Sequence, residues 1–300
     1  MRVGLIGTGW WATTVHAPSL AAHPAIDFVG IWGRDQARAA ELSAACGARE
    51  YVHLDSLIDD VDALSFAVPP AIQANLAVRA AGRGRHLLLE KPIATSVAEA
   101  RRLENAVAAT GVASIVFFTH RFLTSTSEWL VRLGQRGGWT CAHVDITFSS
   151  SGLETRSPWR YEHGALWDLG PHVLSLVVPL LGDVNAIVAA RGRGDQVHLI
   201  MQHSAGRSST ASVSLTAPAA IGTHVCVDGE AGRDVLPPPS LETPLVVAAH
   251  HAALDGLLAL ADQPGRGHPC DVRFGARVVE VLDGARRSLA NGCRSEIVGH

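Results

Sequence analysis

The sequence predicts a two-domain protein: an N-terminal doubly wound α/β domain followed by an α+β domain with a mostly antiparallel sheet. The chain has 300 residues, which is more than one hydrophobic core usually serves. Short apolar runs alternate with amphipathic stretches up to about residue 120, after which polar and apolar residues alternate within the runs. We therefore place the first domain at residues 1–120 and the second at residues 121–300.

Five apolar runs in the first domain are interpreted as strands of a parallel sheet. They are VGLIG (3–7), IDFVGIW (26–32), DALSFAV (62–68), HLLLE (86–90) and ASIVFF (113–118). Their aliphatic residues are unbroken by polar alternation, which is typical of strands covered on both faces. Helices are predicted between them at about residues 10–22, 35–45, 71–81 and 96–109, so the domain consists of βαβ units.

The second domain begins with a predicted helix at about residues 122–133 and continues with alternating runs. These are CAHVDITFS (141–149), AIVAARG (186–192), QVHLIMQH (196–203), STASVSLT (209–216) and THVCVDG (223–229), a pattern typical of an antiparallel sheet with one covered face. An apolar helix is predicted at residues 165–181, and two helices near the C-terminus are expected to pack on this domain. We expect the open face of the sheet to be apolar and to join copies into a homodimer or homotetramer.

The composition excludes several classes of protein. The 25 basic residues are scattered and balanced by 28 acidic ones, which argues against a nucleic-acid partner. No apolar run approaches the roughly 18 residues of a membrane span, and the N-terminus reads as a strand and not as a signal peptide. Without a signal peptide the protein is expected in the cytoplasm, and five widely spaced cysteines predict reduced thiols. The histidines lack metal-site spacing, so no metal is expected.

The stretch Gly7-Thr8-Gly9-Trp10-Trp11-Ala12 fits the pattern G-x-G-x-x-G/A directly after a predicted strand and at the start of a helix. Gly7 permits the tight turn, Gly9 lets the backbone approach a pyrophosphate, and Ala12 allows close helix–strand packing. The helix N-terminus attracts phosphate charge. The motif thus predicts a dinucleotide-binding Rossmann domain, the alternative being a glycine turn without a ligand.

Glu90-Lys91-Pro92 follows the run HLLLE. Ligands of an open parallel sheet bind beyond the carboxyl ends of its strands, so Lys91 is expected in the same crevice as Gly7. The proline restricts Lys91 to extended geometry. A functional lysine is therefore predicted, against the alternative of a solvated surface charge.

Gly33-Arg34-Asp35 follows the run IDFVGIW, where NAD-specific folds carry an acid that binds the ribose hydroxyls. Gly33 takes the place of that acid, and the Arg34 guanidinium can pair with a 2′-phosphate. Asp35 suits the N-cap of the next helix, although it can reach the ribose if the turn is longer. The sequence thus predicts that NADP(H) is preferred, with NAD(H) possible.

The segment from Asp168 to His172 reads D-L-G-P-H within an apolar run. In a helix, Asp168 and His172 lie four residues apart on one face, within hydrogen-bonding reach. Two polar groups in an apolar helix point to a site. The alternatives are a satisfied core pair, or a helix cap formed by Asp168 ahead of Gly170 and Pro171.

Together these motifs resemble the Gfo/Idh/MocA oxidoreductases, the glucose-fructose oxidoreductase and inositol dehydrogenase superfamily. Three motifs occur in family order: the dinucleotide fingerprint, E-K-P and D-x-G-x-H. Similarity extends over residues 68–94, the FTHRF stretch (118–122), the SPWR stretch (157–160) and a closing helix that ends in SLANG (288–292). The sequence departs from the family at His163-Gly164-Ala165, where a longer glycine-rich run is common, and at Ser175, often an Asp.

The resemblance implies an NAD(P)-dependent oxidoreductase that moves hydride between the nicotinamide and a carbinol or carbonyl carbon of a sugar, polyol or similar small molecule. It implies that Lys91, Asp168 and His172 surround that carbon. His172 is our choice as acid/base, with Asp168 orienting it and Lys91 bonding the same substrate oxygen; either His172 or Lys91 can be the immediate proton donor.

The expected cofactor site comprises Gly7, Thr8, Gly9, Trp10, Trp11, Ala12, Gly33, Arg34, Pro69, Glu90 and Lys91. Trp10 or Trp11 is expected to line the channel beside the nicotinamide, unless both pack in the core. Two other functions fit the same motifs. One is a glycosidase that uses the cofactor transiently, and the other is a nucleotide-binding sensor without chemistry.

Overall fold

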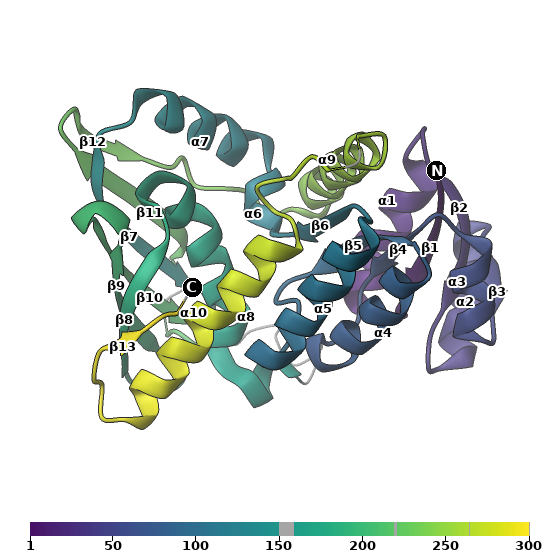
Figure 1. Cartoon of the computed structure of the whole chain (residues 1–300), viewed down its shortest axis with the longest axis horizontal. Helices are drawn as coiled ribbons and strands as arrows, with labels where there is room; N and C mark the ends of the chain where they lie inside the picture. Colours follow the sequence, from purple (N-terminus) through teal and green to yellow (C-terminus); the bar gives the residue numbers. More distant parts are fainter. Residues whose placement is uncertain (150–158, 219–220, 264, 300) are drawn as a thin grey trace. The chain divides into compact units, whose positions relative to one another are not determined.

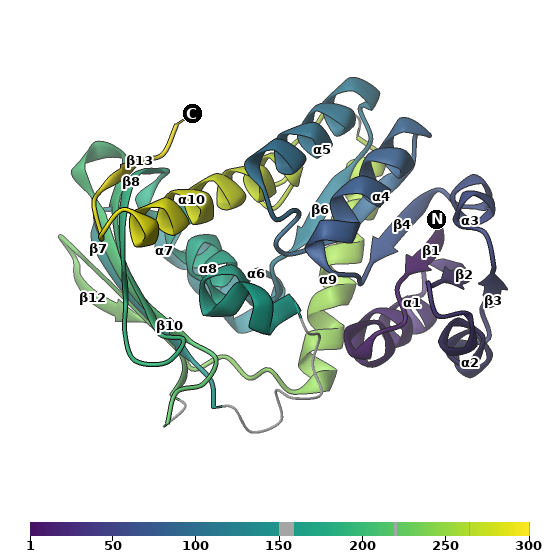
Figure 2. The same ribbon diagram turned by 90° about the horizontal axis from the view of Figure 1, so that it is seen from below.

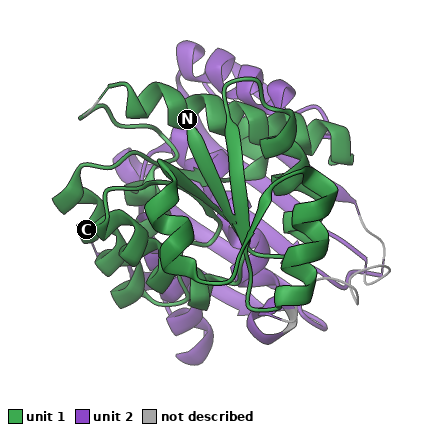
Figure 3. Cartoon of the chain, turned by 90° about the vertical axis from the view of Figure 1, so that its right-hand side faces the viewer, with its two compact units in different colours: residues 1–122, 241–276 green, residues 123–240, 277–300 purple. Residues whose placement is uncertain are grey.

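The computed structural model describes residues 1–149, 159–218, 221–263 and 265–299. The chain forms two compact units, coloured separately in Figure 3. The first comprises Met1–Phe122 and Leu241–Ala276, and the second Leu123–Ser240 and Arg277–His300. The sequence pattern predicted that everything after residue 120 belongs to the second domain. The structure instead groups Leu241–Ala276 with the first unit, because the helix in this segment packs on that unit's sheet.

The first unit contains a six-stranded parallel sheet with the order β3-β2-β1-β4-β5-β6, the order of doubly wound dinucleotide-binding folds. Its strands are β1 (Arg2–Ile6), β2 (Asp27–Trp32), β3 (Arg49–Tyr51), β4 (Ala63–Phe66), β5 (His86–Glu90) and β6 (Ser114–Phe117). Five of the six were predicted. β3 was missed because its three residues include two charged ones and form no apolar run.

Helices cover both faces of this sheet (Figure 2). On one face lie α3 (Leu54–Asp60), α4 (Pro70–Gly82) and α5 (Val97–Thr110), and on the other lie a π-helical segment η1 (Ala12–His16), α1 (Ala17–Ala22), α2 (Gln36–Cys46) and α9 (Thr243–Ala261). The short α6 (Thr119–Phe122) ends the unit's first segment. α9 contacts β5, β6, η1 and α1. Its apolar face is therefore buried in the first unit.

The second unit contains a seven-stranded sheet with the order β12-β11-β7-β10-β9-β8-β13. Only β7 and β10 run parallel to each other, which confirms the predicted, mostly antiparallel sheet. The strands are β7 (Trp139–Thr147), β8 (Val184–Arg191), β9 (Val197–His203), β10 (Ser208–Ser214), β11 (Gly222–Gly229), β12 (Gly232–Val235) and β13 (Glu296–Ile297).

One face of this sheet packs against α8 (Trp159–Leu181), which contacts β7, β9 and β10 (Figure 1). The unit also holds α7 (Thr124–Arg136), a short 3-10 turn η2 (Ser204–Gly206) and most of α10 (Val272–Ala290). Val144, Val213 and Met201 on neighbouring strands are almost fully buried on the α8 side. The core of the unit therefore lies between the sheet and these helices.

The outward face of the same sheet is not the apolar surface expected from the sequence. Its exposed side chains are polar at most described positions, including His143, His198, Gln202, Thr210 and His224. The apolar exceptions are Ile200, with 54% of its surface exposed, and two residues on the edge strands of the sheet, Ile297 with 75% and Val235 with 44% exposed. The expectation of an apolar face is therefore wrong, whereas assembly of copies through this face stays a prediction that needs its own test.

Two helices are long and apolar enough to cross a membrane by length and composition, although the sequence analysis identified no such segment. They are Glu162–Leu181 of α8 and the whole of α9. In α8, 83% of the most apolar 18-residue stretch is buried, and in α9 39% of the corresponding stretch is buried. The burial of α8 identifies it as a core helix of its unit. In α9 the polar residues His250 and His251 bond to groups of the first unit, both to Ser19.

Candidate active site

The glycine loop after β1 has the shape that the dinucleotide motif requires. Gly7 has a φ of 127°, and a Cβ there would lie 2.3 Å from the carbonyl oxygen of Ala67, so only glycine fits. At Gly9 a Cβ would meet nothing within 4 Å, which leaves open space beside the backbone. Ala12 is fully buried. These residues fit a dinucleotide, with a pyrophosphate approaching at Gly9 and the start of the following helix.

The turn after β2 contains the residues that we expect to contact the adenosine ribose of the cofactor. Gly33 faces Thr8 so closely that a Cβ would lie 2.5 Å from the Thr8 methyl, which leaves no room for an acidic side chain in this arrangement. Asp35 caps α2 by accepting a hydrogen bond from the Arg38 backbone N–H at 3.1 Å, as the sequence analysis predicted. Arg34 is exposed. The Arg34 guanidinium is therefore exposed to solvent, whereas the Asp35 carboxylate is used in the cap of α2.

Trp11 and Glu90 join the glycine loop to the end of β5. The Trp11 indole N–H donates to Oε1 of Glu90 at 2.7 Å, and Trp11 is half-buried. The rings of Trp10 and Trp11 lie 5.5 Å apart, and Trp10 is 44% exposed. Neither tryptophan is thus a buried core residue. Pro69, which precedes α4, lies at the same carboxyl edge of the sheet because it follows β4.

Beneath Trp11, buried histidines continue the hydrogen-bond network. Nε2 of His16 lies 3.1 Å from Oε1 of Glu90, and its Nδ1 lies 2.8 Å from the Ser65 hydroxyl and 3.2 Å from Nε2 of His250. Nδ1 of His250 lies 2.8 Å from the Ser19 hydroxyl. His16 and His250 are both fully buried. The network therefore connects α9 to the first turns after the glycine loop.

Which groups donate and which accept in this network follows from the chemistry of its terminal groups, Glu90 and Ser19. A carboxylate only accepts hydrogen bonds, so His16 donates to Glu90 from Nε2, and its Nδ1 lone pair is left to accept from Ser65 or from His250. Burial, reinforced by the charges of neighbouring histidines, holds the pKa of His250 well below its usual range. A neutral His250 then donates from Nε2 and accepts from Ser19. The π-helical turn η1, in which the Ala17 N–H bonds back to Ala12, sets the inward position of His16.

Lys91 directly follows Glu90 and is buried. It is the only lysine among the chain's 25 basic residues, the rest being arginines. Arginine supplies a permanent charge, whereas a lysine ammonium is a compact donor that can also lose its proton. Burial, reinforced by the charge of Lys91, lowers the pKa of the neighbouring His120 to about 4. At neutral pH His120 is therefore a neutral imidazole beside Lys91.

Asp168 and His172 occupy successive turns of α8, and both are buried. The helix is interrupted at Gly164, whose φ of 71° and ψ of −174° are not helical. Asp168 therefore lies inside the second helical piece and is not its cap, which rules out one of the alternatives. An ion pair joins Asp168 Oδ1 to Nε of Arg160 at 3.7 Å. In the SPWR stretch Ser157 and Pro158 lie outside the described residues, whereas Arg160 is described.

The remaining positions of D-x-G-x-H serve the packing of α8. A Cβ at Gly170 would lie 2.5 Å from a methyl group of Leu282 on α10, so glycine allows the two helices to approach. Ser175 is fully buried, and its hydroxyl donates to the His172 carbonyl oxygen at 2.8 Å. The serine that replaces the family's frequent acid thus stabilises the helix locally.

The structure thus gathers most of the predicted residues within the first unit and assigns two to the second. Around the carboxyl edge of the first sheet lie the glycine loop, Gly33, Pro69, Glu90 and Lys91, whereas Asp168 and His172 belong to the second unit. Four residues of these networks were not predicted from the sequence: His16, His250, His120 and Arg160. His120 and Arg160 stood within stretches quoted for the family, but no spacing in the sequence connects His16 with His250.

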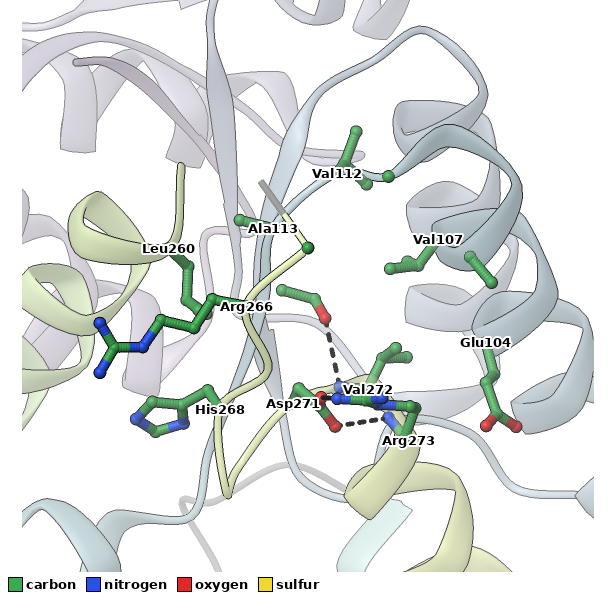
Figure 4. A pocket seen from close by; sticks show the side chains of 14 residues that line it. Glu104, Val107, Val112, Ala113, Leu260, Arg266, His268, Asp271, Val272 and Arg273 are labelled. Atoms are coloured by element: carbon green, nitrogen blue, oxygen red, sulfur yellow. Dashed lines mark hydrogen bonds and ion pairs between the residues drawn. The ribbon is translucent and has the colours of Figure 1, made fainter. Parts of the chain in front are cut away.

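A separate cavity of about 210 Å³ lies at the opposite edge of the first sheet (Figure 4). Its lining includes Ser114, which begins β6, together with Asp271 and Arg273. The last two pair with each other at 2.6 Å, and the Ser114 hydroxyl accepts from the Val272 N–H at 3.2 Å. Because its polar groups are engaged and it lies at the amino ends of the strands, we do not assign the cofactor to it.

The fold and the site define a dinucleotide-binding Rossmann domain combined with an α+β domain. A sequence profile of the oxidoreductase family with an NAD-binding Rossmann fold, Gfo/Idh/MocA, matches residues 1–118. The profile of the Gfo/Idh/MocA C-terminal domain matches residues 130–233. The chain therefore belongs to the Gfo/Idh/MocA family, and the resemblance seen in the motifs is confirmed.

Several relatives and solved structures have names that refer to sugars. The chain is 27% identical to a dTDP-3,4-didehydro-2,6-dideoxy-alpha-D-glucose 3-reductase of Streptomyces antibioticus, over 85% of this chain and 82% of the relative. It is 27% identical to a glucose-6-phosphate 3-dehydrogenase of Bacillus subtilis, over 59% of this chain and 52% of the relative, about half its length. A levoglucosan dehydrogenase in complex with NADH has the same fold, with a TM-score of 0.86, 19% identity and coverage of 100% and 99%.

Proposed function

We propose that this protein is a nicotinamide-dependent oxidoreductase that interconverts a hydroxyl and a carbonyl group of a sugar or a related polyol. The observation that carries the proposal is the placement of Lys91. The chain's only lysine is buried immediately beyond β5, at the sheet edge where the glycine loop fits a dinucleotide. The names of two relatives support a sugar as substrate, and the reduced thiols suit the cytoplasm.

A bound nicotinamide supplies or accepts the hydride, and the protein's own residues handle the proton and the charge. Lys91 donates a hydrogen bond to the reacting oxygen of the substrate and stabilises negative charge on it during oxidation. His172 takes up or returns the hydroxyl proton, since an imidazole titrates near neutral pH. Asp168, which is ion-paired with Arg160, orients His172 and stabilises its charged form.

We further propose that NADP(H) is preferred over NAD(H). Three features of the turn after β2 support this preference. Gly33 has no room for the acid that binds the ribose hydroxyls in NAD-specific folds, because Thr8 fills the space. Asp35 is engaged as the cap of α2. Arg34 is exposed and can pair with a 2′-phosphate through two hydrogen bonds.

A substrate screen tests the proposal. Sugars, sugar phosphates, polyols and nucleotide-linked keto-sugars are incubated with the purified protein and either cofactor, while the absorbance of reduced nicotinamide is followed. We expect at least one sugar to change that absorbance stoichiometrically, and Lys91→Ala to abolish the change. Release of a free sugar from a glycoside without net change of the cofactor would instead indicate a glycosidase, and cofactor binding without turnover of any compound would indicate a sensor.

A further inference from the structure

The outward face of the second unit's sheet gathers three side chains of the kind that bind transition metals. Cys141 and His143 lie two residues apart on β7, and Asp228 lies directly opposite Cys141 on β11. Side chains at directly opposed positions of an antiparallel pair share one face of a sheet. The donor atoms of the three side chains all lie within 4.8 Å of one another.

The distances leave room for an ion between these donors. Oδ2 of Asp228 lies 4.0 Å from Sγ of Cys141 and 4.0 Å from Nε2 of His143. In a tetrahedral zinc site, bond lengths of about 2.0–2.3 Å place neighbouring ligand atoms roughly 3.3–3.6 Å apart. The donors therefore need to draw together by about 0.4–1.5 Å. His143 is exposed and the other two are partly exposed, so their side chains can make this adjustment.

Two neighbouring residues already orient the donors. Nδ1 of His143 lies 2.8 Å from the Thr210 hydroxyl on β10, which directs Nε2 toward the cluster. Arg233 holds the Asp228 carboxylate, with Nε at 2.8 Å from Oδ1 and Nη2 at 2.9 Å from Oδ2. Partners of this kind, behind the ligands, fix ring and carboxylate orientation in metal sites. Oδ2 can still bind an ion through its second lone pair.

We propose that Cys141, His143 and Asp228 form a zinc site with a fourth position open to water. Thiolate, imidazole and carboxylate are all ligands that zinc accepts, and three protein ligands plus water is an established coordination pattern. Binding releases the proton of the Cys141 thiol. The charges of thiolate and carboxylate balance those of Zn²⁺, which lowers the electrostatic cost of holding the ion beside Arg233.

This site is distinct from the one assigned to hydride transfer. Its residues point away from the sheet face covered by α8, which carries Asp168 and His172. No metal was expected from the sequence, because the potential ligands do not recur at the short, regular spacings of known metal sites. Here the third ligand comes from a strand more than 80 residues later in the chain, and only the register of β7 and β11 reveals it.

Metal titration of the full chain tests the proposal. The protein, without an affinity tag, is stripped with a chelator, kept reduced and titrated with Co²⁺, which gains a charge-transfer absorption when it binds a thiolate. We expect one equivalent to give this absorption and Zn²⁺ to displace it. Cys141→Ser should abolish the absorption, and His143→Ala should weaken Zn²⁺ binding by about 100-fold or more. Thr210→Val, which removes only the orienting hydroxyl, should weaken it by about 10-fold.

Two matched variants control the titration. His198 lies on the same sheet face and bonds through Nδ1 to Ser212 at 2.9 Å, but it is outside the cluster, and Cys293 is an exposed thiol elsewhere. His198→Ala and Cys293→Ser should bind the metal like the wild type. The proposal is overturned if the wild type shows no thiolate absorption, if Cys141→Ser keeps it, or if the control variants lose it. Circular dichroism of each variant checks that it remains folded.

Discussion

The indole nitrogen of Trp11 and the carboxylate of Glu90 lie 2.7 Å apart, so the first turn after the glycine loop is fastened to the end of β5. A hydrogen bond to a charged group contributes about 1.5–3 kcal/mol. Removing the indole donor with Trp11→Phe should lower the free energy of unfolding by about 1–3 kcal/mol and raise the KM for the cofactor more than it lowers kcat. Urea unfolding and steady-state kinetics measure both.

Trp32→Phe is the control for this prediction. The Trp32 indole also lies in the first unit and donates a longer bond, 3.3 Å, to the neutral carbonyl of Val52. Its loss should cost less, about 1 kcal/mol or below, and leave the KM unchanged. Equal effects of the two substitutions on stability and on KM would show that the Glu90 contact has no special role.

Substituting Lys91 tests its catalytic role. Lys91→Ala and His172→Ala should each lower turnover by about 10² or more while leaving the dissociation constant of the cofactor nearly intact. Lys91→Arg should also be impaired, because a guanidinium keeps the charge but neither the compact shape nor the ability to lose a proton. Unchanged turnover in both alanine variants would remove these residues from the mechanism.

The uniqueness of Lys91 allows a direct check on its accessibility. The chain contains one lysine and one α-amino group, so reductive methylation can label only two amines. Saturating cofactor and substrate should slow labelling of Lys91 without affecting Met1. The rates follow from mass spectrometry of the peptides that carry each residue, and identical protection of both amines would argue against a ligand at Lys91.

The cofactor preference depends on Arg34. Arg34→Ala should weaken NADPH binding by about 1.5–3 kcal/mol, roughly 10- to 150-fold, with little effect on NADH. Arg38→Ala is the matched control, because this exposed arginine lies one turn further along and pairs with Asp35. The measurement is of kinetic constants for both cofactors. A wild type that prefers NADH, or an Arg34→Ala variant that loses affinity equally for both cofactors, would contradict the assignment of Arg34 to the 2′-phosphate.

Stability should depend on pH through His120. Its pKa is about 4 in the folded protein and near 6.5 in an unfolded chain, so only the unfolded state takes up the proton between these values. The free energy of unfolding is therefore highest above pH about 6.5 and falls as the pH decreases, by up to about 1.4 kcal/mol per pH unit. His250, whose pKa is also lowered by burial, acts in the same direction.

Urea unfolding at several pH values measures this slope. His120→Gln should flatten it between pH about 6.5 and 4, because the variant has no imidazole to protonate at that position. His224→Gln, at an exposed position of the second sheet, should keep the slope of the wild type. A slope that is the same in His120→Gln and in the wild type would show that other groups cause it.

We still predict a homodimer or homotetramer that forms through the outward face of the second sheet, and Ile200 offers a way to test it. Ile200 is 54% exposed on that face, whereas Val52 is 62% exposed in the first unit. Ile200→Arg should shift the mass measured by light scattering toward a single chain, and Val52→Arg should not. A wild type that has the mass of one chain at micromolar concentration would refute the prediction.

Features that depend only on residues close together in the sequence could be predicted. The glycine loop, the position of Lys91 at a strand end and the Asp35 cap all follow from local patterns. The contact between His16 and His250 could not be predicted, because it joins residues 234 positions apart and has no spacing to recognise. The polar outward face was predictable, since Cys141, His143 and Asp145 alternate with buried residues along β7, and the expected apolar surface conflicted with that pattern.

The return of Leu241–Ala276 to the first unit has a consequence for the order in which the protein is made. A nascent chain that has left the ribosome up to Phe122 holds all six strands of the first sheet, but not α9, which covers β5 and β6. Until α9 emerges, His16 lacks its imidazole partner, and Phe117 lacks the His250 ring that packs 5.0 Å from it. The unit that begins first is therefore completed only after the strands β7 to β12 of the other unit have been synthesised, and a fragment that ends at Phe122 is expected to expose apolar surface and to aggregate.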